Sequence, residues 1–211
     1  MLELPSSEIH PFSAGNPDTP YHNNIMADID KLENMRLPVL DKLRDEVRQN
    51  LDELISSKNG RLNSIAWLAR NILELTTWSA YCAESEENSK QFVLDAVRDV
   101  NDVLNVPEGI YAADFDFRAI RQENIDKAEA DGFTSLDDNF TAVINAAKKL
   151  GRGDDFKYRN KLFSKFAHPT ALSVIYQSKE IEATLKSKFY AVGIRMAEGT
   201  IRYLDEAIAK G

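Results

Sequence analysis

Apolar residues recur at every third or fourth position through most of the chain, which is the period of an α-helix. Residues 61–83 are apolar on nearly all sides and predict a central, largely buried helix. Residues 181–208 predict a last helix of about 30 residues. Further helices are expected over 23–57, 89–104, 114–130 and 136–150. Because no alternating run is long enough for a sheet, the predicted fold class is all-α, a helical bundle.

Proline and glycine modify this pattern at a few places. Pro38 interrupts the first helical stretch and predicts a kink or two abutting helices there. Gly193 and Gly199 each weaken the last helix by about 1 kcal/mol relative to alanine, and they also allow another helix to approach closely. Four of the seven prolines fall within the first twenty residues. They predict an irregular N-terminal arm over residues 1–22, either a partly ordered tail or a segment that docks on a partner subunit, followed by one domain over residues 23–211.

Composition excludes several classes of protein. The chain has 211 residues and a formal net charge of −8, which argues against a protein that coats nucleic acid through a generally basic surface. There is no run of apolar residues long enough to span a membrane and no signal peptide at the start, so we expect a cytoplasmic protein without a membrane segment. The single Cys82 lies on an apolar helix and is interpreted as a small buried hydrophobe.

Motifs for the common cofactors are absent. The sequence contains no phosphate loop, no dinucleotide-binding turn and no nucleophile elbow. Its three histidines, His10, His22 and His168, do not have the spacing of zinc or di-iron ligands. We therefore expect neither a cofactor nor a metal.

Charge is unevenly distributed along the chain. Residues 148–168 carry seven basic and two acidic side chains, whereas residues 84–138 carry fifteen acidic and five basic ones. The basic run is interpreted either as a face that binds a polyanion or as a solvated helix face that pairs with the acidic stretch.

The basic run ends at the dipeptide His168-Pro169. Proline disfavours helical geometry at the residue before it and suits a first helical turn, so His168 is expected at a junction, near the N-cap of a following helix. Ser164 and Lys161 would lie one and two turns before it, on a similar face. Such a group is suited to holding a phosphate. The alternative is a structural role, in which His168 caps the helix and binds a buried carboxylate.

The central helix carries a second polar group, Arg70-Asn71-Ile72-Leu73-Glu74. Arg70 and Glu74 are four positions apart and share a helix face. Charged side chains in so apolar a helix are seldom unpaired. We weigh two arrangements: an internal Arg70–Glu74 ion pair that sets helix register, and a Glu74 carboxylate that orients His168.

Together these motifs carry a resemblance. An Arg-Asn-x-x-Glu helix, followed about 90 residues later by an aromatic-rich helix that ends in Ser-x-x-x-His-Pro, resembles a bacterial family of unknown function within the HEPN-like superfamily. The likeness spans roughly residues 60–105 and 156–205. It implies a helical, often dimeric domain, found in many metal-independent endoribonucleases of toxin–antitoxin and other defence systems. Their motif separates an arginine from the histidine by four to six intervening residues, which here corresponds to Phe163, Leu162 or Lys161, and only Lys161 is basic.

The resemblance and the residues together give two functional hypotheses. In the first, the protein binds RNA or nucleotide phosphate and cleaves RNA without metal, with His168, Lys161 and Arg159 as catalytic residues. Its supporting residues are Arg70, Asn71, Glu74, Tyr158, Ser164 and Lys165. In the second, the protein is a non-catalytic homodimer that binds another protein. A third interpretation is a small-molecule pocket around Trp67, Trp78 and His168.

Overall fold

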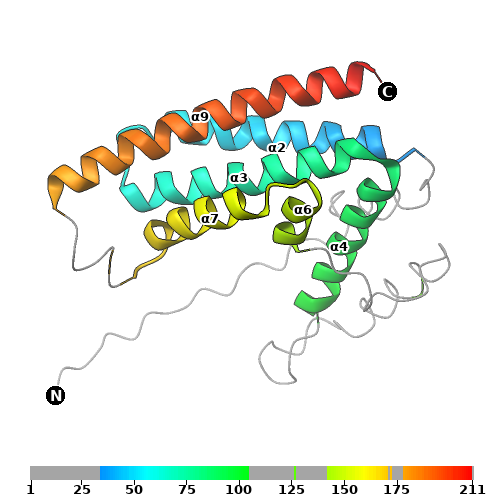
Figure 1. Ribbon diagram of the computed structural model, residues 1–211, viewed down its shortest axis with the longest axis horizontal. Coiled ribbons are helices and arrows are strands. Elements are labelled where there is room, and N and C mark those ends of the chain that lie inside the picture. The colour runs from blue at the N-terminus through cyan, green and yellow to red at the C-terminus, as the bar shows by residue number, and fades with distance from the viewer. Residues whose placement is uncertain (1–33, 105–125, 127–141, 171, 173–177, 211) are drawn as a thin grey trace, which may run out of the picture. The chain divides into compact units, whose positions relative to one another are not determined.

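The computed structural model describes residues 34–104, 126, 142–170, 172 and 178–210 (Figure 1). These residues belong to one compact unit, Glu33–Gly211, and contain no β-strand. The predicted all-α fold is confirmed. Its helices are α2 (Arg36–Ser56), α3 (Leu62–Glu84), α4 (Glu86–Leu104), α6 (Val143–Lys149), α7 (Gly153–Ala167) and α9 (Lys179–Ala209).

The two helices with the clearest apolar pattern lie where the sequence predicts them. α3 matches the predicted central helix to within one residue at each end, and α9 is a 31-residue helix that covers the predicted last one. α4 begins three residues before the expected start. The expected arm over 1–22, the start of the domain at residue 23 and nearly all of the expected helix over 114–130 lie outside the described residues. Of that helix only Asp126 is described, and it is helical.

Pro38 does not kink a long helix within the described residues. It is the third residue of α2, which begins at Arg36. The first backbone N–H groups of a helix have no hydrogen-bond partner within the helix. A proline in the first turn, which lacks an N–H group, therefore removes no intrahelical hydrogen bond. The predicted interruption is therefore a helix start.

The N-terminus of α2 is capped from a distant helix. Its N-cap residue, Met35, offers no side-chain cap, and Glu86 of α4 accepts hydrogen bonds from the backbone N–H groups of Met35 and Arg36, the latter at 3.1 Å. A carboxylate at this position satisfies two free donors and complements the positive end of the helix dipole. This contact fastens the start of α2 to the start of α4.

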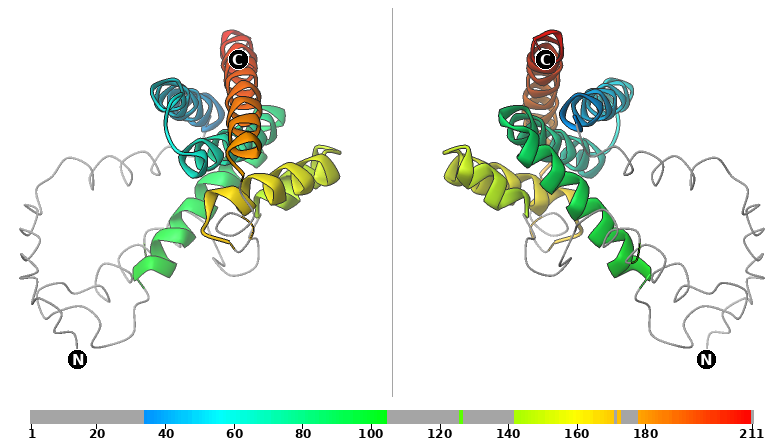
Figure 2. Two further views of the ribbon diagram at one scale, coloured as in Figure 1. Left: turned by 90° about the vertical axis from the view of Figure 1, so that its left-hand side faces the viewer. Right: turned by 90° about the vertical axis from the view of Figure 1, so that its right-hand side faces the viewer.

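α9 packs against both α2 and α3. Figure 1 shows these helices running along one another, and Figure 2 shows that α4 leaves in a different direction. Gly193 of α9 is buried at the contact, where a Cβ atom would lie 2.6 Å from Leu54 Cδ2 and 3.7 Å from Ala69 Cα. The close helix approach expected at the glycines therefore occurs at Gly193. It does not occur at Gly199, where a Cβ atom would meet nothing within 4 Å.

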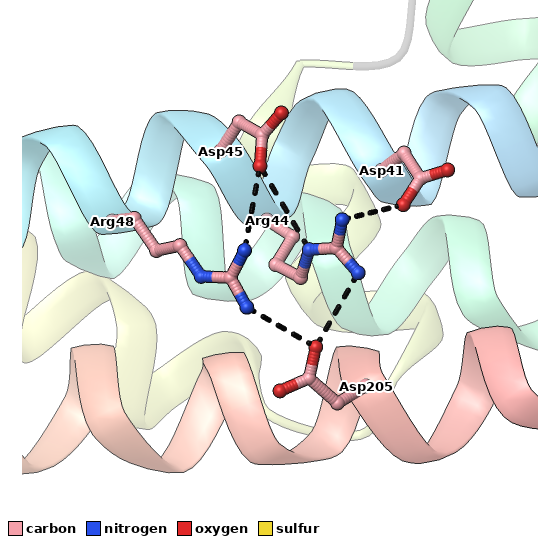
Figure 3. Close-up of polar contacts among 5 residues, drawn as sticks. All are labelled: Asp41, Arg44, Asp45, Arg48 and Asp205. Carbon is pink, nitrogen blue, oxygen red and sulfur yellow. Dashed lines mark hydrogen bonds and ion pairs between the residues drawn. The ribbon is translucent and has the colours of Figure 1, made fainter.

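Ion pairs also join α2 to α9 on the surface (Figure 3). Arg44 and Arg48 both reach Asp205 at 3.4 Å, and Asp41 and Asp45 flank the two arginines. Most of these side chains are well exposed, and exposed ion pairs contribute little free energy each. They orient α9 on α2 more than they stabilise the fold.

α7 lies antiparallel to α3. This direction determines where the polar residues of α7 lie relative to those of α3. Three contacts fix the direction: Leu73 and Phe156 share one cavity wall, Arg70 meets Asn160, and Leu68 lies near Ala167. Phe156, Phe163 and Phe166 are buried in the main core, where Phe163 packs edge-on against Phe189 of α9 with ring centroids 5.1 Å apart. The opposite face of α7 is left to solvent.

A second apolar cluster surrounds Tyr81 and Cys82 near the end of α3. Cys82 is fully buried there, as expected for a small hydrophobe. Burial raises the pKa of its thiol to about 12. Trp78 packs against the rings of Tyr81 and Phe92, with centroids 5.8 and 5.0 Å away. Trp78 is thus part of the packing, and neither Trp78 nor His168 is among the residues that line the cavity at Trp67.

Candidate functional site

The exposed face of α7 is lined with lysines. Lys157, Lys161 and Lys165 recur every four residues and are all exposed. Positions four apart on a helix lie on one face, about 6 Å apart along the axis. Tyr158, whose side chain is 70% exposed, borders this row. We call Lys157, Lys161 and Lys165 the lysine face.

No carboxylate among the described residues neutralises the lysine face. Within the described part of the chain, none of its three ammonium groups forms an ion pair. The other basic residues of the run have different surroundings. Lys149 donates a hydrogen bond to the Tyr81 hydroxyl at 3.1 Å, and Arg159 binds the Asp155 carboxylate at 2.8 Å.

His168 lies at the end of this face. It is exposed and forms the C-cap of α7, and its backbone N–H donates to the Ser164 carbonyl oxygen at 3.4 Å. Thr170 closes the same helix end, because its hydroxyl donates to the Lys165 carbonyl oxygen at 2.9 Å. Pro169 and Thr170 are not helical, and residues 171 and 173–177, where the following helix was expected, lie outside the described residues.

The predicted catalytic residues do not all come together. Lys161 precedes His168 by seven positions, two helical turns, so both lie on one face of α7. Arg159 precedes His168 by nine positions, two and a half turns, which places it on the opposite side and about 13 Å away along the axis. Its side chain lines a cavity toward α3 and α9. Arg159 is therefore not a partner of His168, and Lys165, one turn before the histidine, is the closer cation.

Arg70 of α3 interacts with Glu74 of the same helix and with Asn160 of α7. Arg70 forms an ion pair with Glu74 at 2.9 Å, and its Nε donates to Asn160 Oδ1 at 3.0 Å. Of the two arrangements weighed from the sequence, the ion pair is the one present. Asn160 lies eight residues before His168, about 12 Å along α7, and Glu74 continues in the opposite direction. Glu74 therefore orients Arg70 rather than His168.

Asn160 was not among the residues singled out from the sequence. It stands one turn before Ser164 on α7, so the spacing Asn160, Ser164, His168 marks a polar edge of this helix. Ser164 itself is partly buried beside this edge, and Asn71 is partly buried one residue beyond Arg70. Only the packing of α3 on α7 identifies Asn160 as the partner of Arg70.

An open depression adjoins the end of α7. It has a volume of about 390 Å³ and is lined by Trp67, Asn63 and Ser64 of α3, by Glu53 and Ser57 of α2 and its end, and by Ala167, the residue before His168. The Trp67 side chain is 46% exposed. An exposed indole beside amide, hydroxyl and carboxylate groups can stack on a flat ring and bind its polar edge.

The site has no metal-binding character in the described residues, where no three His, Cys, Asp or Glu side chains are grouped as ligands. None of the described helices has the length and apolarity required to cross a membrane. No family model, curated protein or solved structure matches this chain. The geometry of α7 and its surroundings is thus what bears on function.

Proposed function

We propose that the lysine face of α7 binds the phosphate backbone of single-stranded RNA. The observation that carries this proposal is the row of three exposed lysines without ion-pair partners among the described residues, in a chain of net charge −8. Lysines that are already paired gain little from a phosphate, whereas unpaired ones release counterions from the nucleic acid when they bind.

The depression beside Trp67 supports a single strand as the ligand. Bases in a duplex are stacked on one another, and only an unpaired base presents its face to a protein side chain. A strand lying on the lysine face and passing His168 would bring a base to Trp67. The link is Ala167, which directly precedes His168 and also lines the depression at Trp67. Glu53 and Asn63 offer hydrogen-bond partners to the edge of that base.

We extend the proposal to metal-independent cleavage at His168, the chemistry that the HEPN-like resemblance implies. The imidazole takes the proton of a ribose 2′-hydroxyl, whose oxygen attacks the adjacent phosphorus. The bond to the 5′-oxygen breaks, and that oxygen leaves with a proton from water. Lys161 and Lys165 offset the charge on the phosphoryl oxygens. The products are a 2′,3′-cyclic phosphate and a 5′-hydroxyl.

A lysine substitution series tests binding. The triple variant Lys157→Gln, Lys161→Gln, Lys165→Gln is compared with the control Lys42→Gln, Lys188→Gln, Lys210→Gln, whose lysines are also exposed but belong to α2 and to α9 and its end. Affinity for a single-stranded RNA oligonucleotide is measured by fluorescence anisotropy over a range of salt concentrations. We expect the first variant to bind weakly and to reduce the slope of log affinity against log salt by about 2, because each phosphate contact contributes about 0.7. Equal binding by both variants, or no binding by the wild type, would refute the proposal.

Cleavage is tested separately with His168→Ala. The wild type should release a 2′,3′-cyclic phosphate in the presence of a metal chelator, and the variant should retain RNA binding but lose cleavage by at least a hundredfold. If the wild type binds RNA without cleaving it, the catalytic extension is wrong and the binding proposal stands.

A further inference from the structure

Three arginines converge on a groove on the other side of α7. Two adjoining cavities of about 220 and 450 Å³ lie between α3, α9 and the junction of α6 with α7. Their shared walls show that they are continuous, since Thr76, Ala80, Leu150, Arg152 and Met196 line both. Arg159 lines the first cavity and Arg195 the second. We call this continuous hollow the arginine groove.

Two of the three arginines belong to α7 and one to α9, and they differ in pairing. Arg152 is the N-cap residue of α7, Arg159 lies two turns further along that helix, and Arg195 belongs to α9. Arg159 is neutralised by Asp155. Arg152 and Arg195 are exposed and have no carboxylate partner among the described residues. Arg152 and Arg195 thus border one hollow from both walls, and the exposed Glu84, which also lines the hollow, forms no ion pair with either arginine among the described residues.

The floor of the groove is polar but internally satisfied. Thr200 is buried and donates its hydroxyl hydrogen to the Met196 carbonyl oxygen at 2.8 Å. The Thr76 hydroxyl, 2.8 Å from Thr200 Oγ1, must therefore be the donor to Thr200. Both hydroxyl hydrogens are used, so the threonines leave only lone pairs toward the groove. The attraction for an anion comes from the arginines.

The rest of the groove is open and combines apolar side chains with the carboxylates of Glu84 and Asp155. Leu150, Ala80 and Met196 form its walls, and Tyr203, 44% exposed, stands at one end. Gly199 also lines it and leaves free the space that a side chain would occupy. A volume of this size falls within the range of small-molecule sites, which combine apolar walls with a few charged groups.

We propose that the arginine groove binds a small phosphate monoester with a ring-sized apolar body. Arg152 and Arg195 hold the phosphate, because a guanidinium group matches phosphate oxygens with two parallel hydrogen bonds. The apolar body lies over Met196 and Leu150, in the space beside Gly199. This site is independent of the RNA-binding proposal, because Arg159 and the lysine face lie on opposite sides of α7.

The test uses phenyl phosphate as the probe and the full chain as the protein. Isothermal titration calorimetry compares phenyl phosphate with its two halves, inorganic phosphate and phenol. We expect phenyl phosphate to bind at least tenfold more tightly than either half, because both parts of the groove are then occupied. Phenyl phosphate that binds no better than inorganic phosphate overturns the proposal.

Two sets of variants locate the binding. Arg152→Gln with Arg195→Gln should weaken phenyl phosphate binding at least tenfold, and the control Arg61→Gln with Arg202→Gln, both exposed arginines outside the groove, should not. Gly199→Leu should lower affinity for phenyl phosphate to that for inorganic phosphate, since the leucine fills the space for the ring. Unchanged binding by the Arg152/Arg195 variant refutes the site. If that variant instead loses RNA binding as the lysine triple variant does, the groove belongs to the RNA-binding surface and the small-molecule proposal is wrong.

Discussion

Arg70 and Asn160, ninety positions apart in the chain, are joined by a hydrogen bond of 3.0 Å in which Arg70 Nε donates to Asn160 Oδ1. The other end of the Arg70 guanidinium is held by Glu74 at 2.9 Å. This arrangement sets the position of α7 along α3 at one point. It thereby determines where the lysine face and His168 come to lie relative to Trp67.

Removing the amide should destabilise the contact between α3 and α7. Asn160→Ala is expected to lower the free energy of unfolding by about 1 kcal/mol, because a hydrogen bond to a charged group is lost in a partly exposed place. Urea unfolding measures the change, and a double-mutant cycle with Arg70→Ala isolates the coupling. Asn71→Ala is the control on α3 and should change stability by less than about 0.5 kcal/mol. A coupling energy near zero would contradict the assigned role.

The two glycines of α9 should respond to alanine in opposite directions. Gly199→Ala is expected to raise the free energy of unfolding by about 0.5–1 kcal/mol, because alanine favours the helix and its Cβ meets open space. Gly193→Ala should lower it by about 1 kcal/mol, because a Cβ 2.6 Å from Leu54 Cδ2 displaces a fully buried side chain from its packed position. Thermal or urea unfolding of the two variants measures both changes. Equal changes in the free energy of unfolding would show that the close approach at Gly193 is unimportant.

The cap that Glu86 of α4 provides to α2 should also contribute measurably to the free energy of unfolding. Glu86→Ala removes the acceptor for two backbone N–H groups and the charge at the helix N-terminus, so we expect a loss of about 1 kcal/mol. Glu87→Ala is the matched control, since Glu87 is the next acidic residue in the first turn of α4 and is exposed. Comparable losses in the two variants would rule out a specific cap.

Cys82 should be unreactive in the folded protein. Its thiol is buried, and its pKa is raised to about 12, so at pH 8 an alkylating reagent should label it only after unfolding in urea. Rapid labelling of the folded protein, followed by mass spectrometry, would contradict its burial.

The raised pKa of the Cys82 thiol also predicts how the stability of the protein depends on pH. An unfolded chain would lose the Cys82 proton near pH 9 while the folded chain retains it to about pH 12. The free energy of unfolding should therefore fall as pH rises above about 9, by up to about 1.4 kcal/mol per pH unit from this group. Urea titrations at pH 8, 9 and 10 should show a steeper decline for the wild type than for Cys82→Ala.

The helices of this protein were largely predictable, and the contacts between them were not. The apolar period of residues 61–83 and 181–208 is a local property, so α3 and α9 lie where the sequence places them. Of the two arrangements expected at Pro38, a kink is absent from α2, which begins at Arg36, and an abutting helix would lie before residue 34, outside the described residues. Arg159 was grouped with His168 because both belong to one basic run, although nine positions place them on opposite sides of a helix.

The sequence by itself determined the all-α fold, the burial of Cys82 and the concentration of basic residues over 148–168, since each depends on local sequence. The tertiary structure decided the Arg70–Asn160 bond, the cap from Glu86 and the convergence of Arg152 and Arg195 on one groove. These join side chains from separate helices, and their meeting depends on how the helices pack. The close contact of Gly193 with Leu54 and Ala69 shows how strongly that packing depends on individual side chains.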